Sequence, residues 1–263
     1  MSPCLAFIIN MASKRPDRHR HMTALMADMG WDAYEFVEPV EGVASGQTNA
    51  ANMSLRNTLL QVIFPKAWQM GLGEFVVFED DVMTMGPRSH VVSRIDGLLQ
   101  EVNSAGLGWD MIYLEYCLEA CSLGMRVSLH LNEAITPFCA AAILFNGRRI
   151  ENVVGCMERY EEPMSFTYSK CIREGRVRAL VASPPLFAQD VVLQGDLNHR
   201  GVHMILNWIM KMYDPDATES SPRLPHCVEG MGGYFRLQFW VLIFGMVILA
   251  CVILFLKHRR SPL

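Results

Sequence analysis

One stretch of the chain decides its fold: Glu74-Phe75-Val76-Val77-Phe78-Glu79-Asp80-Asp81-Val82. The apolar run is rich in β-branched and aromatic residues, which predicts a buried strand, and the three acids mark its carboxyl end. In an open α/β sheet, ligands bind outside the carboxyl ends of the strands. If the extended backbone continues through the acids, Glu79 and Asp81 point to one side and Asp80 to the other. We therefore expect the acids to face a crevice in which chemistry takes place.

Three adjacent carboxylates also predict a divalent cation. Each carboxylate raises the pKa of its neighbours unless a cation offsets the charge. Magnesium and manganese take oxygen ligands and are commonly shared with substrate phosphates, so we expect Mn²⁺ or Mg²⁺ on Glu79 and Asp81 beside a diphosphate. A solvated acidic turn without a ligand is the alternative, because charge runs are often solvated surfaces.

Strand and helix signals alternate along the chain, which favours an α/β layered fold with a mostly parallel sheet. Besides the acidic strand, strands are predicted at 4–10, 33–37, 109–116 and 139–145. Helices are predicted from 17 to a stop at Gly30, over 55–70 with a break near Pro65, and over 89–104 and 148–160.

Basic residues follow the first predicted strand. Lys14, Arg15, Arg18 and Arg20 lie in one short stretch. A solvated helix start is one interpretation, and a site for the phosphates of a nucleotide is the other. The net charge of −4 and the lack of a long basic patch argue against a nucleic-acid partner.

The end of the chain predicts a membrane anchor. Residues 239–256 contain no charged residue, and Lys257, His258, Arg259 and Arg260 follow directly. Eighteen helical residues span about 27 Å, close to the hydrocarbon thickness of a bilayer. A buried core helix is the alternative. We expect a catalytic domain over 1–213, a linker rich in proline and glycine over 214–235, and a transmembrane helix with a short basic tail over 236–263.

The compartment stays open at this point. The basic tail favours a cytosolic C-terminus, which would place the domain in a lumen or outside the cell. No basic segment precedes the first apolar run, so the simpler expectation is a tail-anchored protein with its domain in the cytosol. Cys117, Cys121 and Cys139 predict a disulfide within the trio if the domain is lumenal. Zinc bound with His130 is the alternative, although the spacing matches no common zinc pattern.

Five segments fall along the chain in a recognisable order. They are Ile8-Ile9-Asn10-Met11 with Arg15-Pro16-Asp17-Arg18, Tyr34-Glu35-Phe36-Val37-Glu38-Pro39-Val40-Glu41-Gly42, Phe78-Glu79-Asp80-Asp81-Val82, Gly108-Trp109-Asp110-Met111-Ile112-Tyr113-Leu114, and Pro185-Leu186-Phe187-Ala188-Gln189-Asp190. They resemble the opening strand with its Arg-x-x-Arg loop, the second strand, the EDD motif, the Trp-Asp-Ile-x-Tyr-Leu strand and the closing Pro-x-Leu-x-Gln segment of glycosyltransferase family 25. This is the lipopolysaccharide and collagen galactosyltransferase-like family, and the similarity runs from about Leu5 to Leu197.

The resemblance implies a GT-A domain that moves a sugar from a nucleotide-sugar donor, expected to be a UDP-sugar, with a divalent metal. It implies that Asn10, Arg15 and Arg18 lie near the nucleotide. Glu79 and Asp81 would bind the ribose side and the metal side of the donor, and Asp80 would support them.

An inverting transfer needs a carboxylate that deprotonates the acceptor hydroxyl. Asp190 and Asp196 are the first candidates, with Asp110 and Glu115 behind them. The acceptor is a glycan, a lipid-linked sugar or a protein side chain.

Two departures from the resemblance keep a second function open. The family's Ser-His pair would fall on Leu59-Leu60, and an aspartate that usually follows a proline is replaced near Pro163-Met164-Ser165. A membrane-tethered scaffold with the same fold but without turnover is therefore the main alternative. A metal-dependent phosphohydrolase would need a second cluster of acids or histidines, and none stands out in the sequence.

Overall fold

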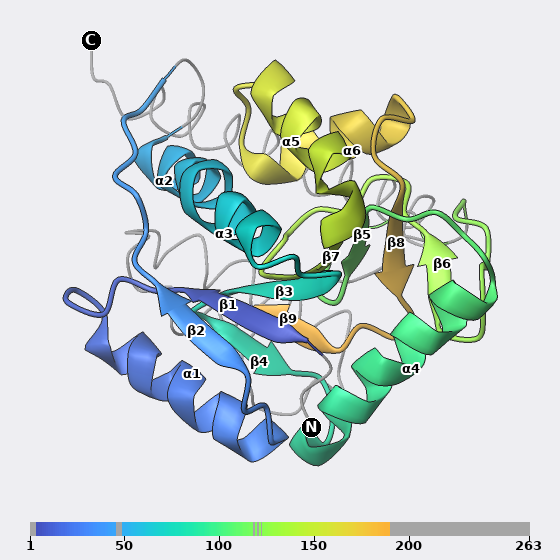
Figure 1. Ribbon diagram of the computed structural model, residues 1–263, viewed down its shortest axis with the longest axis horizontal. Helices are drawn as coiled ribbons and strands as arrows, with labels where there is room; N and C mark the ends of the chain where they lie inside the picture. The colour runs from blue at the N-terminus through green and yellow to red at the C-terminus, as the bar shows by residue number, and fades with distance from the viewer. Residues whose placement is uncertain (1–3, 46–48, 118, 120, 122, 190–263) are drawn as a thin grey trace, which may run out of the picture. The chain divides into compact units, whose positions relative to one another are not determined.

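The computed structural model describes residues 4–45, 49–117, 119, 121 and 123–189, all within one compact unit (Figure 1). The predicted linker over 214–235, the predicted membrane helix over 236–263, Asp190 and Asp196 lie outside the described residues. In the part of the chain that is described, no helix is both long and apolar enough to cross a membrane.

Nine strands and the helices between them make up the described chain. The strands are β1 (Leu5–Ile9), β2 (Tyr34–Val37), β3 (Glu74–Glu79), β4 (Val82–Thr84), β5 (Met111–Tyr113), β6 (Leu131–Glu133), β7 (Ala142–Asn146), β8 (Ala179–Ala182) and β9 (Phe187–Gln189). The helices are α1 (Pro16–Met29), α2 (Ala50–Thr58), the π-helical η1 (Leu59–Ile63), α3 (Phe64–Gln69), η2 (Arg88–His90), α4 (Val91–Ser104), η3 (Gly147–Arg149), α5 (Ile150–Arg159) and α6 (Met164–Arg173).

Seven strands form one sheet in the order β2-β1-β3-β7-β5-β8-β6, and β4 pairs with β9 in a second, two-stranded sheet. Strand β1 is parallel to β2 and β3, and β5 is parallel to β8. Both β3 and β5 pair with β7 in antiparallel fashion, so they run in the same direction as each other. Only β7 and β6 oppose the other strands of this sheet, which confirms the mixed α/β fold with a mostly parallel sheet.

Helices cover both faces of this sheet (Figure 1). Helices α1 and α4 pack against the face that carries Val76 and Phe78, and α2, α3, α5 and α6 pack against the face that carries Phe75 and Val77. Because both faces are buried, the strand reads as a continuous apolar run instead of an alternating one. This double burial explains why the stretch from Glu74 was recognisable in the sequence.

One helix ends, and another changes its geometry, where the sequence predicts it. Helix α1 ends at Gly30, whose φ of 70° is left-handed and whose N–H donates to Ala27 and Met26. The long helix over 50–69 changes to π-helical geometry over Leu59–Ile63, just ahead of Pro65. Proline has no N–H and its ring crowds the preceding turn, so the ordinary hydrogen-bond ladder cannot continue there. Both breaks were predicted from the sequence.

Other elements had no clear signal. Helix α6 and strands β4, β6 and β8 were not predicted, and the strand expected over 109–116 is confined to Met111–Tyr113. The chain leaves the sheet after Tyr113 because Leu114 and Glu115 both donate their N–H groups to Ala142, which bends it away from the ladder.

Asp110 stabilises the opposite end of the sheet from the acidic stretch. It precedes β5, whereas the acids follow β3, and the two strands run in the same direction. Its carboxylate is 1% exposed and accepts hydrogen bonds from Arg149 Nε at 2.7 Å, Asn152 Nδ2 at 2.8 Å and the Arg178 N–H at 2.7 Å. Asp110 is therefore a structural residue, and its candidacy as a catalytic base was wrong.

Replacing Asp110 with alanine should lower the free energy of unfolding by about 1–3 kcal/mol, because Arg149, Asn152 and the Arg178 N–H lose a nearly fully buried acceptor. Urea denaturation of the full chain measures this. The matched control is Asp28→Ala, which removes an exposed acid paired with Arg88 and should cost less than about 1 kcal/mol. Equal losses in the two variants would contradict the structural role.

Candidate functional site

The acidic stretch meets two other segments at the carboxyl edge of the sheet. Asn10 directly follows β1, the acids close β3, and Glu115 lies two residues after β5. Strand β1 lies between β2 and β3, and the chain passes from β1 to β2 on one side before β3 leads on to the other. This is a topological switch point, the place where α/β sheets open a crevice for ligands.

Strand register brings Asn10 onto the acids. Ile9 pairs with Glu79 in the parallel β1–β3 ladder, so the next residue of each strand meets across the same gap. Asn10 Nδ2 donates to Asp80 Oδ2 at 2.7 Å, and the Asn10 side chain is almost fully buried. An ionised carboxylate only accepts, so the amide nitrogen must face Asp80. This leaves Asn10 Oδ1 buried without a hydrogen-bond partner in the described structure.

Arg18 bridges two of the acids from the first turn of α1. Its Nη1 donates to Asp80 Oδ1 at 2.7 Å, and its Nη2 lies 3.8 Å from Asp81 Oδ2. Asp80 is 8% exposed and Asp81 4% exposed, so this guanidinium compensates charges that water barely reaches. Arg18 thus lies in direct contact with two of the three acids.

The predicted alternation of the three acids is wrong. Strand β3 ends at Glu79, and Asp80 and Asp81 form a turn that leads into β4. Because side chains alternate only in extended backbone, the turn lets Asp80 and Asp81 converge on Arg18. Glu79 instead follows Val77 and points to the opposite face of the sheet.

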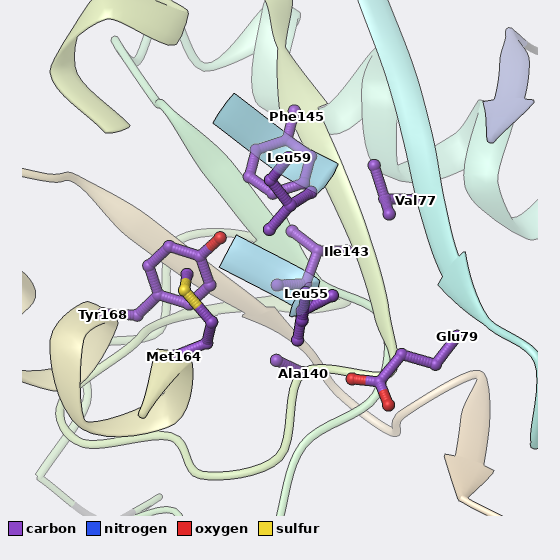
Figure 2. Close-up of a pocket in the computed structure, with 9 residues that line it drawn as sticks. All are labelled: Leu55, Leu59, Val77, Glu79, Ala140, Ile143, Phe145, Met164 and Tyr168. Carbon is purple, nitrogen blue, oxygen red and sulfur yellow. The ribbon is translucent and has the colours of Figure 1, made fainter. Parts of the chain in front are cut away.

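Glu79 closes one end of a small apolar pocket. Figure 2 shows its carboxyl group beside Ala140, with Leu59 and Met164 among the side chains that line the space. Both are positions at which the sequence departs from its family resemblance, and here they supply apolar surface. The full lining is Leu55, Leu59, Val77, Glu79, Ala140, Ile143, Phe145, Met164 and Tyr168.

Gln189 reaches Asp81 from the end of the described chain. The antiparallel pairing of β4 with β9 sets Val82 opposite Gln189. Gln189 Nε2 then lies 3.3 Å from Asp81 Oδ2. This contact was not predicted, since nothing in the sequence signals that a three-residue strand so far along the chain pairs just beyond the acids.

Glu115 joins the acids through Ala141. The Ala141 N–H donates to Glu115 Oε2 at 3.0 Å, and the Ala141 carbonyl accepts from the Glu79 N–H at 2.8 Å. The Glu115 side chain is buried. Glu115 was a secondary candidate for the catalytic base, behind Asp190 and Asp196, and the structure places it beside Glu79.

Burial and mutual repulsion raise the pKa values of these carboxyl groups. Burial, followed by Asp81, Glu115 and Asp80, raises the pKa of Glu79 to about 8. Burial and the charge of Asp81 raise the pKa of Glu115 to about 8, despite the hydrogen bond from Ala141. Burial raises the pKa of Asp81 to about 6, against the opposing effect of Arg18. The edge is therefore short of positive charge, which is the electrostatic condition for a cation site.

The residues predicted for the site fall into three groups. Arg15 makes a bidentate contact with Asp17 at the start of α1, at 3.1 and 2.9 Å. Asn10, Arg18, Glu79, Asp80 and Asp81 share the carboxyl edge. The prediction for Asp190 and Asp196 stays untested, because the described chain ends at Gln189.

Carboxylate oxygens fit a hard cation, but the protein does not complete a cage. In the described ranges, no group of three histidine, cysteine, aspartate or glutamate side chains is placed to hold a metal ion. Because Glu79 points to the opposite face of the sheet, a metal on Asp81 would need further oxygens from substrate phosphates and water, as magnesium sites commonly have.

Two disulfides lie in the described chain. Cys117 bonds to Cys139, which confirms a disulfide within the predicted trio, and Cys156 in α5 bonds to Cys171 in α6. Oxidised Cys117 and Cys139 supply no thiolates, so the zinc alternative was wrong. The first crosslink ends two residues from Glu115 on one side and two residues from Ala141 on the other.

No protein-family model and no curated protein matches the chain. Among solved structures, a glycosyltransferase involved in glycosylation of the major capsid of PBCV-1 is 14% identical, with a TM-score of 0.42 over 71% of this chain and 92% of that chain. An apo UDP-glucose pyrophosphorylase is 10% identical, with a TM-score of 0.37 over 67% of this chain and 71% of that chain. A mannose-1-phosphate geranyltransferase from Thermus thermophilus is 10% identical, with a TM-score of 0.33 over 67% of this chain and 58% of that chain. These likenesses to transferases are too low to assign an activity to this chain.

The raised pKa values predict how stability depends on pH. Between the ordinary glutamate pKa of 4.5 and about 8, the folded protein keeps protons on Glu79 and Glu115 that the unfolded chain releases. The free energy of unfolding should therefore fall as pH rises through this window, by up to about 1.4 kcal/mol per pH unit for each group. Glu115→Gln should flatten this decline and make the protein more stable than wild type at pH 8.

Urea denaturation in EDTA from pH 5 to 8.5 measures the decline in the absence of divalent metal. Glu133→Gln serves as the control, since Glu133 is partly exposed and lies near Arg178 on a surface strand. Parallel stability curves for wild type and Glu115→Gln would contradict the raised pKa.

Proposed function

We propose that this protein is a glycosyltransferase that moves a sugar from a nucleotide-sugar donor, with a UDP-sugar as the expected donor. The observation that carries the proposal is the contact of Arg18 with Asp80 and Asp81 at the β1–β3 switch point, with Asn10 beside them. Such a site offers a cation for a diphosphate and carboxylates for a metal at the edge where α/β domains bind ligands.

The nucleotide would lie between the β1–α1 segment and the acids. Arg18, with Arg15 in the same segment, would bind phosphate oxygens, and the N-terminal end of α1 also favours an anion. Asn10 Oδ1 would accept from a hydroxyl or N–H of the nucleotide, because it is the buried acceptor that has no partner in the described structure. Asp80 would orient both side chains through its hydrogen bonds.

Asp81 would hold Mn²⁺ or Mg²⁺ on the side of the leaving diphosphate, whereas Glu79, the second ligand predicted from the sequence, points to the opposite face of the sheet. A bound metal offsets the charge that develops on that leaving group. The protein's own residues then orient the donor and limit the access of water, since Asp80 and Asp81 lie almost out of contact with solvent. Glu79 would contact the donor from the pocket side of the sheet.

Asp190 and Asp196 remain the proposed proton acceptors for the acceptor hydroxyl. Asp190 directly follows Gln189 in the sequence, and Gln189 itself contacts Asp81. Glu115 is the described carboxyl group that serves as the alternative, because it shares Ala141 with Glu79. A base must reach the acceptor within hydrogen-bond distance, so substitution of each residue separates the candidates.

We propose a glycan, a lipid-linked sugar or a protein side chain as the acceptor, and a membrane anchor over 236–263. Two disulfides in the domain favour an oxidising compartment, a lumen or the cell exterior. The basic residues after the anchor favour the same orientation. We therefore reverse the simpler sequence expectation of a cytosolic domain.

The compartment proposal predicts the redox state of the cysteines. When the full chain is isolated from its own membrane with an alkylating reagent present, Cys117, Cys139, Cys156 and Cys171 should be modified only after reduction. Peptide mass spectrometry of the denatured protein measures this. The free thiol of Cys4 is the internal control, since unfolding alone should expose it to the reagent. Alkylation of all four cysteines without reduction would place the domain in the cytosol.

The activity itself is tested by UDP release from a panel of UDP-sugars by the full chain in detergent, with and without Mn²⁺. Wild type should release UDP in a metal-dependent manner, and Asp81→Asn should lower the rate on the order of 100-fold, equivalent to about 2.7 kcal/mol. Asp28→Asn, which changes an exposed acid of α1, should keep the wild-type rate.

A second candidate function is a scaffold that binds nucleotide without turnover. The apolar pocket lining at Leu59 and Met164 favours it, because these positions carry no group for a polar substrate. Nucleotide binding by calorimetry without UDP release from any donor would support the scaffold. Release by wild type and by Asp81→Asn at the same rate would contradict the metal site.

A further inference from the structure

We propose that Arg18 competes with the metal for Asp81. The diphosphate of the donor would bind Arg18 and so free Asp81 for the metal. Arg18 would thus oppose metal binding and favour nucleotide binding. This inference rests on the proposed function and concerns how the same site is controlled.

The contacts of Arg18 place one cation where another would have to bind. Its guanidinium donates to Asp80 at 2.7 Å and lies 3.8 Å from the Asp81 oxygen proposed as a metal ligand. The side chains of Arg18, Asp80 and Asp81 are 13%, 11% and 5% exposed, so solvent screens this contact weakly. A divalent ion on Asp81 would meet a fixed positive charge at short range.

The supports of this arrangement come from several segments. Arg18 belongs to the first turn of α1, Asn10 holds the other oxygen of Asp80, and Gln189 lies against Asp81. Both carboxylate oxygens of Asp80 thus accept a hydrogen bond, one from Asn10 and one from Arg18, and this holds the guanidinium in place. A second anion bound to Arg18 would draw its guanidinium away from Asp81 and leave that carboxylate to the metal.

A nucleoside diphosphate supplies that anion. Arginine binds phosphate oxygens with two parallel N–H groups, and a diphosphate carries enough charge to bridge a guanidinium and a metal. When Arg18 moves from Asp81 to the phosphates, the repulsion between its guanidinium and the metal ion falls. The phosphates also supply oxygen ligands that the protein lacks at this site. By linkage, the nucleotide must then strengthen metal binding by the same factor as the metal strengthens nucleotide binding.

The proposal makes opposite predictions for the two ligands. Arg18→Gln should tighten Mn²⁺ binding to the nucleotide-free protein by about 10-fold or more, because the competing charge is gone. The same variant should weaken UDP binding in saturating Mn²⁺ by about 10-fold or more, because the phosphates lose an arginine. Loss of a merely structural residue would weaken both. Arg18→Lys keeps the charge and should bind Mn²⁺ alone as weakly as wild type.

Free Mn²⁺ is measured by electron paramagnetic resonance, and UDP binding by calorimetry, on the full chain in detergent. Arg88→Gln, which removes an exposed arginine paired with Asp28, should leave both affinities unchanged. Arg18→Met keeps the apolar stem of the side chain and repeats the neutral substitution should Arg18→Gln fail to fold. Unchanged or weaker Mn²⁺ binding by both neutral variants would overturn the proposal. Failure of wild type to bind Mn²⁺ even with UDP would instead overturn the proposed metal-dependent function.

Discussion

Asp80 and Asp81 are adjacent carboxylates that solvent barely reaches, and the rest of this edge depends on how their charge is compensated. An ionised group removed from water is unfavourable unless it is paired and hydrogen-bonded. Compensation comes from Asn10 after β1, Arg18 in α1 and Gln189 in β9. The acid pair therefore ties together segments that are distant in sequence.

The sheet supplies the positions for this compensation. Parallel pairing of β1 with β3 brings two carboxyl ends together, and antiparallel β7 carries Ala141 between the ends of β3 and β5. Glu79 and Glu115 consequently lie near Asp81, and burial together with the charge of Asp81 raises the pKa of both. A divalent metal and a diphosphate match this edge because one neutralises the acids and the other neutralises the arginine. That reciprocal match, more than any single residue, supports a nucleotide-sugar site.

Local signals made much of the fold predictable. The buried strand, its acidic end, the Gly30 stop and the break before Pro65 all follow from chemistry within a few residues. The direction of the acids was not predictable, because it depends on a turn that the β4–β9 pairing stabilises from the far end of the domain. The role of Asp110 was equally hidden, since its partners Arg149 and Arg178 belong to other segments. Long-range contacts, rather than propensities, decided these points.

The Cys117–Cys139 crosslink closes a loop at the edge of the sheet that carries the acids. Both cysteines lie two residues from groups that position the acids, Glu115 and Ala141, so the crosslink closes a loop directly at its base. Once the base is fixed, the entropic cost of lengthening such a loop grows only slowly with its length. The loop is nevertheless anchored in the domain, because it carries strand β6 with the fully buried Leu131, and Glu119, whose carboxylate accepts from the Ile135 and Thr136 N–H groups. Longer insertions should therefore be tolerated only at its exposed stretches, around Leu123 and Leu129.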